Sequence, residues 1–357
     1  MSDRHESIDE RRRQLLAGMG ALALGFDLAP LRAQTNVSLR FLCPQGALVQ
    51  SALDGFAKTG ARVDVEVYPD APAIFPKVAA RNAAYDVVVA PERVVARMIF
   101  ANLLQNIDGK LVPNLKNIDP AFANANFDPG RRYSVAYAWG TLGVGYRRSV
   151  LGVEPGSWKW IFDSDRYAGR ISWLNDPELT IGCALKYQRH SVNTLDKAEL
   201  DAAIQLLEGQ RPRVAQLTAT EAGELLLSRK ADLVLARNGE ISRARAQDPD
   251  IDYVVPGEGS LLLQYCLCIP RRAQHPNEAH ALIDYLLEPQ VGAEIARTLR
   301  YATPIAAARA ALPEAERNDP VTYPDDEIIA RSEIVNYRGE RVISKYEKAW
   351  QSINAKA

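Results

Sequence analysis

Histidine and cysteine are scarce in this 357-residue sequence, with four of each, and the common catalytic motifs are missing. The sequence contains no Gly-x-Ser-x-Gly elbow, phosphate-binding loop, His-Glu-x-x-His motif or dinucleotide-binding fingerprint. His275 and His280 stand at the wrong spacing for a metal pair and are predicted to be surface residues. We therefore predict no catalytic residue, no metal and no cofactor, and we expect a binding protein rather than an enzyme.

A surplus of charge of either sign is also missing. The 43 basic and 44 acidic residues leave a net charge of −1, which gives no reason to expect nucleic acid or an acidic membrane surface as a partner. Hydrophobic residues make up 47% of the chain and charged residues 24%, as in ordinary soluble globular proteins. The length favours two domains.

The N-terminal apolar run, residues 15–28, is too short to cross a bilayer. Because it follows a cluster of arginines, residues 1–33 are predicted to be a signal peptide. The pair Arg12-Arg13 ahead of two leucines resembles the twin-arginine export signal, which delivers folded proteins to the periplasm. The mature protein is therefore predicted to be periplasmic.

The four cysteines are Cys43, Cys183, Cys266 and Cys268. A disulfide is possible in an exported protein, but the connectivity cannot be deduced from one sequence. Cys266 and Cys268 are too close in the chain to bridge to each other easily. Buried free thiols are the favoured state.

Strand-like and helix-like segments alternate along the chain. Strands are predicted at 37–42, 62–68, 85–90, 133–146, 169–174, 232–236 and 261–269. Helices are predicted at 47–56, 74–84, 94–101, 157–162, 180–189, 196–209, 218–228, 277–287, 291–299 and over most of 324–357. The helices at 196–209 and 218–228 begin with capping-box-like patterns, at Asp196 and Thr218. This alternation predicts an α/β fold with mostly parallel sheets flanked by helices.

The segment 133–146 combines a strand pattern with glycines in its second half. Glycine inside a strand marks a bend or a close backbone approach. We predict that this strand crosses from one lobe to another and that Gly140 and Gly143 form a hinge. The alternative is an ordinary core strand with a bulge.

Polar residues follow four of the predicted strands. They stand at 43–46, 91–93, 175–178 and 237–240. In open α/β sheets, ligands bind outside the carboxyl ends of the strands. Four such ends, two in each half of the chain, predict a ligand cleft between two lobes.

Several segments together resemble one family. They are 85–89, 117–122, 139–146, 169–174, 285–289 and 301–304. From residue 37 onwards the chain is similar to the periplasmic spermidine/putrescine-binding proteins of ABC importers. The resemblance implies the type II periplasmic-binding fold, a two-lobed receptor that closes on a small-molecule solute. It also implies a partner, the ABC transporter permease in the inner membrane, and we expect the receptor to be a monomer.

The resemblance further implies lobe boundaries. Lobe 1 would comprise residues 37–137 and 258–303. Lobe 2 would comprise residues 138–257 and 304–357. The chain would then pass between the lobes three times.

The family holds its diammonium ligand with aromatic faces and carboxylates, and much of that cage is replaced in this sequence. The residues predicted to bind ligand are Gln45, Arg93, Asp176, Arg237, Glu240, Tyr265 and Tyr301. An arginine 4 Å from an ammonium costs about 4 kcal/mol at an effective dielectric constant of 20. Arg93 and Arg237 therefore argue against a polyamine, unless both guanidiniums turn away or pair with Glu92 and Glu240.

The predicted function is capture of a small solute for an ABC importer of the polyamine transport family, with a diverged site. One alternative is a carboxylate- or amino-acid-like ligand in the same receptor. A second alternative is an exported enzyme on a similar scaffold, and a third is a sensor that signals closure to a membrane partner.

Overall fold

The computed structural model describes residues 37–47, 49–69 and 71–356. The predicted signal peptide, residues 1–33, lies outside the described residues, so the twin-arginine signal stays a prediction. From residue 37 onwards the chain forms one compact unit. The predicted boundaries between two lobes therefore also stay a prediction.

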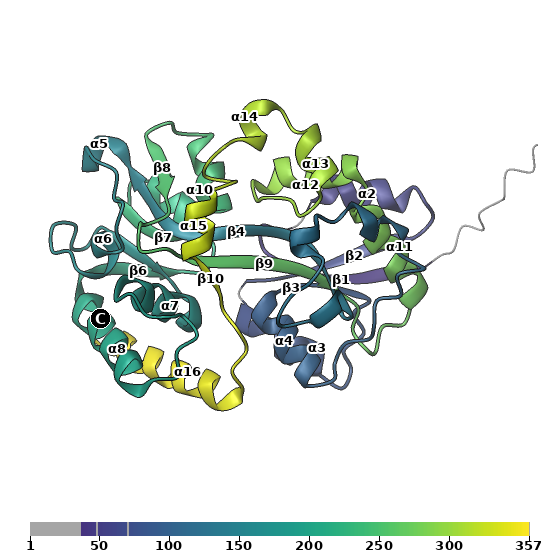
Figure 1. The fold of residues 1–357 in the computed structure, drawn as a ribbon, viewed down its shortest axis with the longest axis horizontal. Helices are drawn as coiled ribbons and strands as arrows, with labels where there is room; N and C mark the ends of the chain where they lie inside the picture. The colour runs from purple at the N-terminus through teal and green to yellow at the C-terminus, as the bar shows by residue number, and fades with distance from the viewer. Residues whose placement is uncertain (1–36, 48, 70, 357) are drawn as a thin grey trace, which may run out of the picture. The chain divides into compact units, whose positions relative to one another are not determined.

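The secondary structure alternates as the sequence predicts (Figure 1). The strands are β1 (Ser38–Pro44), β2 (Arg62–Tyr68), β3 (Val87–Pro91), β4 (Ser134–Arg147), β5 (Ile171–Leu174), β6 (Val214–Thr218), β7 (Leu233–Arg237), β8 (Ile251–Val254), β9 (Leu261–Cys268) and β10 (Glu333–Ile334). The helices are α2 (Gln50–Ala57), α3 (Ile74–Ala79), α4 (Glu92–Phe100), α5 (Arg148–Leu151), α6 (Lys159–Phe162), α7 (Pro177–Tyr187), α8 (Lys197–Gln210), α9 (Ala222–Leu227), α10 (Asn238–Arg245), α11 (Pro276–Leu286), α12 (Pro289–Leu299), α13 (Ala306–Ala311), α14 (Glu314–Arg317), α15 (Asp326–Arg331) and α16 (Glu340–Asn354).

The strands follow one another in the order β2-β1-β3-β9-β4-β7-β5-β6, with β10 beside β9 and β8 beside β4. We call β1, β2, β3 and β9 the first half, and β5, β6, β7 and β8 the second half. β1 is parallel to β2 and β3, and β5 is parallel to β6 and β7. β9 is antiparallel to β3 and β4, and β4 is antiparallel to β7. Two parallel groups are therefore joined by long antiparallel strands, which run between them in Figure 1.

Strand β4 belongs to both halves, and its position agrees with the strand predicted at 133–146 to within one residue at each end. As far as Thr141 it pairs with β9, and from Leu142 it pairs with β7. A register irregularity falls between Ala136 and Ala138, well before the change of partner. The chain thus crosses between the halves at Thr141–Leu142.

The glycines of β4 serve close packing rather than an unusual backbone conformation. Neither Gly140 nor Gly143 has a positive φ. A Cβ atom on Gly140 would collide with the Asn238 side chain, and one on Gly143 would collide with the Val254 carbonyl oxygen. Close approach, one of the two roles that glycine has inside a strand, is therefore the one found here. Their part in a hinge remains a prediction.

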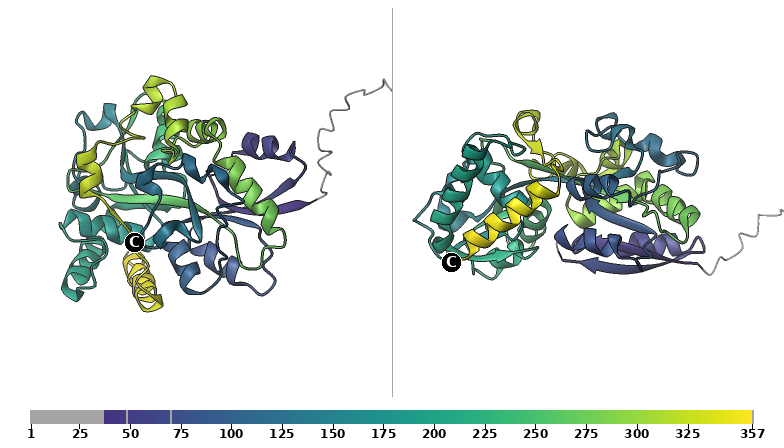
Figure 2. Two further views of the ribbon diagram at one scale, coloured as in Figure 1. Left: turned by 45° about the vertical axis from the view of Figure 1, so that its right-hand side comes forward. Right: turned by 90° about the horizontal axis from the view of Figure 1, so that it is seen from below.

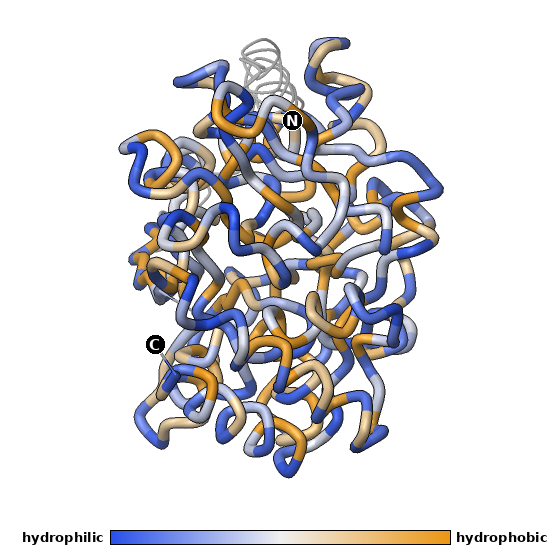
Figure 3. Tube along the Cα trace, turned by 90° about the vertical axis from the view of Figure 1, so that its left-hand side faces the viewer, coloured by the Kyte–Doolittle hydropathy of each residue, from blue (hydrophilic) through white to orange (hydrophobic). Residues whose placement is uncertain are grey.

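Each half of the sheet is covered on both faces, and the inner strands β3, β5 and β7 are accordingly buried along almost their whole length. In the first half, α2, α11 and α12 pack on one face and α3 and α4 on the other. In the second half, α7, α8 and α16 pack on one face and α9 and α10 on the other. Figure 2 shows α16 beside α7 and α8. In Figure 3, hydrophobic segments run through the interior and hydrophilic segments occupy many outer loops.

Two of the helix starts can be compared with their predicted caps. Asp196 accepts the backbone N–H groups of Ala198 and Glu199 at 2.8 and 3.1 Å, so the predicted cap of α8 is confirmed. The predicted cap at Thr218 is wrong, because Thr218 ends strand β6 and α9 begins only after Glu221. Strand β6 was not predicted, because it is short and the exposed polar residue Gln216 interrupts its apolar pattern.

Three further details differ from expectation. Helix α3 ends at Ala79 rather than at residue 84, and β8 and β10 are additional strands. His280 is buried rather than on the surface, and its Nε2 accepts the backbone N–H of Asp108 at 3.0 Å. The prediction of buried free thiols is confirmed for all four cysteines.

Of the helices in the described part of the chain, none combines the length and apolar character that crossing a membrane requires.

Candidate ligand-binding site

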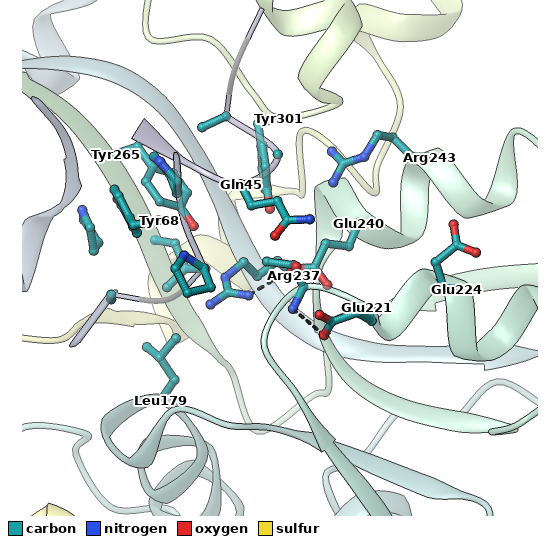
Figure 4. A pocket seen from close by; sticks show the side chains of 18 of the residues that line it. Gln45, Tyr68, Leu179, Glu221, Glu224, Arg237, Glu240, Arg243, Tyr265 and Tyr301 are labelled. Atoms are coloured by element: carbon teal, nitrogen blue, oxygen red, sulfur yellow. Dashed lines mark hydrogen bonds and ion pairs between the residues drawn. The ribbon is translucent and has the colours of Figure 1, made fainter. Parts of the chain in front are cut away.

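A cavity of about 400 Å³ lies between the two halves, where strands of both end (Figure 4). From the first half it is lined by residues that follow β1, β2 and β3, together with β9. From the second half it is lined by the starts of α7, α9 and α10. The polar and aromatic side chains that matter below are Gln45, Tyr68, Arg93, Glu221, Glu224, Arg237, Glu240, Arg243, Tyr265 and Tyr301.

Three of the four predicted strand ends contribute to this cavity. Residues of 43–46, 91–93 and 237–240 line it, because parallel strands deliver their carboxyl ends to one edge. The fourth end, 175–178, does not line it. That segment borders a smaller cavity of about 70 Å³, which shares Arg93 with the larger one.

Arg93 joins the two halves through a buried ion-pair cluster. Its Nη2 donates to the carboxylate of Asp176, and its Nε donates to Glu178 at 3.1 Å. Burial alone would lower the pKa of Arg93, but the neighbouring carboxylates Asp176 and Glu178 hold it above its ordinary value. The guanidinium is therefore charged and already neutralised by the protein.

Asp176 is the one predicted ligand-binding residue that the structure keeps away from the cavity. Its Oδ1 accepts the backbone N–H of Leu179 at 3.1 Å and so caps α7. Its Oδ2 accepts from Arg93. Both oxygens are occupied by the protein, which leaves Asp176 a positioning role toward Arg93.

Glu92 is not the partner of Arg93 that the sequence suggested. Its side chain is buried, and Oε2 accepts the backbone N–H of Gln264 at 2.8 Å. Burial raises the pKa of Glu92 to about 7. The carboxyl therefore ties the start of α4 to β9, while Arg93 turns to Asp176 and Glu178.

Arg237 and Glu240 form the second buried pair, which the sequence did offer as an alternative. Arg237 Nη1 donates to Glu240 Oε1 and to the Ala219 carbonyl, each at 2.9 Å. Burial raises the pKa of Glu240, and the Arg237 charge opposes that shift. In Figure 4 the Arg237 guanidinium lies near the centre of the cavity, on the side toward Tyr265.

Three tyrosines form the aromatic part of the lining. The rings of Tyr265 and Tyr301 lie 6.0 Å apart between centroids. Tyr68 is buried and its hydroxyl donates to the Val89 carbonyl at 2.8 Å. Tyr68 was missed in the sequence, although it ends β2 and the strand-end rule could have found it. Gln45 lines the cavity beside Tyr68, because its backbone N–H donates to the Tyr68 carbonyl.

The arrangement weakens the electrostatic argument against a polyamine. That argument assumed guanidiniums without partners, whereas Arg93 has two carboxylates and Arg237 has one. Glu221 and Glu224, which sequence reasoning also missed, add two exposed carboxylates from the α9 region. The cavity thus holds both signs of charge, and Arg93, Arg237 and Glu240 are already paired.

The described residues offer no group of three or more His, Cys, Asp or Glu side chains that could hold a metal ion. The groups that line the cavity can recognise a solute through hydrogen bonds, ion pairs and aromatic faces. Tyr hydroxyls, one amide and charged groups converge on a small space, which is the usual constitution of a small-molecule site.

Comparison with known proteins gives consistent results. Residues 53–324 match the family model described as bacterial extracellular solute-binding protein. The chain is 32% identical over 348 residues to the spermidine/putrescine-binding periplasmic protein of Escherichia coli, covering 96% of this chain and 98% of that one. It is 28% identical over 304 residues to a putrescine-binding periplasmic protein of Pseudomonas aeruginosa, covering 80% of this chain and 83% of that one.

Solved structures are similar as well. A putative spermidine/putrescine ABC transporter from Listeria monocytogenes superposes with a TM-score of 0.85 at 28% identity, covering 90% of this chain and 99% of that one. A spermidine/putrescine ABC transporter substrate-binding protein from Streptococcus pneumoniae gives 0.79 at 25% identity, with the same coverage.

Proposed function

The chain belongs to the bacterial extracellular solute-binding proteins, and we propose that it captures a small solute in the periplasm for an ABC importer. The α/β periplasmic-binding fold of type II, predicted from the sequence, is confirmed by the similar solved structures. The observation that carries the proposal is the 400 Å³ cavity lined from both halves. A solute that contacts both halves favours the closed arrangement over an open one.

In this proposal the two halves act as lobes, with the boundaries predicted above. Closure bends the strands that join them, and the change of partner at Thr141–Leu142 of β4 is the natural place for that bend. The Arg93 cluster contributes to the closed state, since its members come from both halves.

The solute class is supported from two sides. The relatives are named for spermidine and putrescine, and the faces of Tyr68, Tyr265 and Tyr301 could attract an ammonium. An amine-containing solute is therefore the first expectation. The export by a twin-arginine signal, the inner-membrane permease partner and the monomeric state belong to the same proposal. No catalytic step is part of it.

Mass spectrometry of protein exported in its native host tests the proposal directly. We expect a small solute to remain bound under native conditions and to be released by denaturation. Small-angle scattering on protein freed of that solute should show a larger radius of gyration, which decreases when the solute is restored. Absence of any bound solute, together with a constant radius, would refute the receptor function.

A further inference from the structure

We propose that the solute carries a carboxylate, which binds the Nε–Nη2 edge of the Arg237 guanidinium. The inference rests on the proposed function, because it names the solute class of the same cavity. Three observations support it. Arg237 has N–H groups without an acceptor, carboxylates fill the same edge of other arginines of this chain, and one carboxylate oxygen of Glu240 has no donor.

Arg237 uses one of its three nitrogens. Nη1 donates to Glu240 and to the Ala219 carbonyl. Within the described residues Nη2 donates no hydrogen bond, and Nε is buried without a partner. Nε and Nη2 lie along one edge of the planar guanidinium and form the fork that receives a carboxylate with two parallel bonds. That fork is free.

Other arginines of this chain show what occupies the same edge. Arg97 donates from Nε and Nη2 to both oxygens of Glu340, at 2.7 and 2.6 Å. Arg170 does the same toward Asp232, at 2.8 Å for both bonds. The edge of Arg93 is divided between Asp176 and Glu178. In these three cases carboxylate oxygens fill the edge, whereas at Arg237 the edge is left to the cavity.

Burial makes the free edge significant. The Arg237 side chain is only 12% exposed, so bulk water cannot solvate the fork freely. A guanidinium cannot release its proton to escape this situation. A buried donor without an acceptor is unfavourable, and a carboxylate on the solute would supply two acceptors of the matching geometry.

The other arginines of the cavity are weaker candidates. Arg93 has no free fork, for the reason given above. Arg243 also lines the cavity, but it is half-buried and donates through Nη1 to the Leu299 carbonyl. Its remaining N–H groups can bond to water. Arg237 is therefore the arginine that gains most from an anionic ligand.

Glu240 adds a requirement of the opposite sign. Its Oε1 accepts from Arg237, while Oε2 is buried without a partner. An N–H donor on the solute, such as an ammonium, would satisfy this oxygen. The Arg237–Glu240 pair thus offers donors and an acceptor side by side. A solute with both a carboxylate and an amine fits it better than a diamine does.

A matched series of small compounds tests the inference by calorimetry. Putrescine, γ-aminobutyrate and succinate have four carbons each: γ-aminobutyrate has a carboxylate in place of one aminomethyl end of putrescine, and succinate has carboxylates in place of both. Ornithine is putrescine with a carboxylate added, which makes five carbons. We expect γ-aminobutyrate or ornithine to bind the wild type more tightly than putrescine does. Arg237→Gln should weaken that binding by about ten- to a hundred-fold, the value of charge-assisted hydrogen bonds.

Control variants separate the fork from general charge and from folding. Arg243→Gln removes the same charge from the same cavity and should weaken acid binding by less than about three-fold, because water that reaches this half-buried side chain screens its charge. The double variant Arg237→Gln/Glu240→Gln leaves no unpaired buried charge, so it should fold and still fail to bind the acids. Arg237→Lys keeps the charge without the fork and should also lose affinity.

Three outcomes would overturn the inference. In the first, the wild type binds putrescine more tightly than γ-aminobutyrate and ornithine, and Arg237→Gln leaves the affinity for these two acids unchanged. In the second, Arg243→Gln and Arg237→Gln lose the same affinity for the acids. In the third, the folded wild type binds none of the acids. The first would leave the receptor function intact, because a solute would still bind between the halves. The receptor function fails only in the experiment on exported protein described above.

Discussion

Arg93 from helix α4 of the first half donates a hydrogen bond to Asp176, which caps helix α7 of the second half. Both side chains are almost fully buried, at 5% and 7% exposure. The pair is therefore a contact between halves that water does not screen. It also explains why a predicted ligand-binding carboxylate is absent from the cavity lining.

Removing this contact should loosen the association of the two halves. In Arg93→Gln, Asp176 loses its ion-pair partner, and Glu178 keeps only Arg338, whose Nη2 lies 4.0 Å from Glu178 Oε1. Breaking a buried pair typically costs 3–5 kcal/mol. We expect a lower melting temperature and a larger radius of gyration without solute, measured by calorimetry and small-angle scattering.

The matched control lies one turn further along the same helix. Arg97 also bonds across to the C-terminal segment, but its partner Glu340 is 56% exposed. Arg97→Gln should therefore cost less than about 1 kcal/mol and leave the radius unchanged. Equal behaviour of the two variants would mean that the buried pair has no special role.

The pH dependence of stability should show the buried carboxyl of Glu92. Its pKa is raised from 4.5 to about 7 in the folded protein, so the folded state retains a proton that the unfolded state releases. This stabilisation is complete below pH 4.5 and is lost as the pH rises to about 7. The total amounts to roughly 3 kcal/mol.

Glu92→Gln removes this titration and keeps a similar shape. Chemical unfolding between pH 4.5 and 7 should then give a flatter curve for the variant than for the wild type, and the gap should close at low pH. Glu314→Gln, a change at an exposed glutamate, serves as the control and should follow the wild type. Parallel curves for Glu92→Gln and wild type would contradict the raised pKa.

The glycines of β4 are expected to be sensitive to any side chain. The hinge hypothesis predicts that Gly140→Val and Gly143→Val lower affinity with little loss of secondary structure. The packing described above adds that even Gly140→Ala and Gly143→Ala should destabilise the fold by about 1–3 kcal/mol, the usual cost of overpacking. Urea unfolding measures this.

Gly209 provides the comparison for both variants. It lies in helix α8, and a Cβ there would meet nothing within 4 Å. Gly209→Ala should therefore stabilise the protein, by about 0.5–1 kcal/mol from helix propensity alone. If the β4 variants are as stable as the wild type, the close contacts around Gly140 and Gly143 are not limiting.

The twin-arginine hypothesis predicts that export depends on the arginine pair near the N-terminus. Changing both Arg12 and Arg13 to lysine should hold the precursor in the cytoplasm, because an ammonium does not reproduce guanidinium geometry. Cell fractionation followed by immunoblotting measures how the protein is distributed between cytoplasm and periplasm, with Arg4→Lys as the control. Normal periplasmic delivery of the double variant would show that another export route is used.

Much of the fold follows from local patterns in the sequence. Strand β4 and the buried strand β3 are apolar and rich in β-branched or aromatic residues, so their character is visible in a short window. The Arg237–Glu240 pair was also foreseeable, since three positions along a helix start bring side chains together. The family resemblance was also recognised from short segments of the sequence, and it implied a fold with two lobes.

The tertiary structure alone decided which charges meet. Arg93 and Asp176 are 83 residues apart, and no local pattern specifies that they bond or that Glu92 turns away to Gln264. Likewise, only the packed cavity reveals that Arg237 keeps a free fork while Arg93 does not. The physical reason is that ion pairs depend on distances between groups brought together by folding, whereas strand and helix character depends on neighbours along the chain.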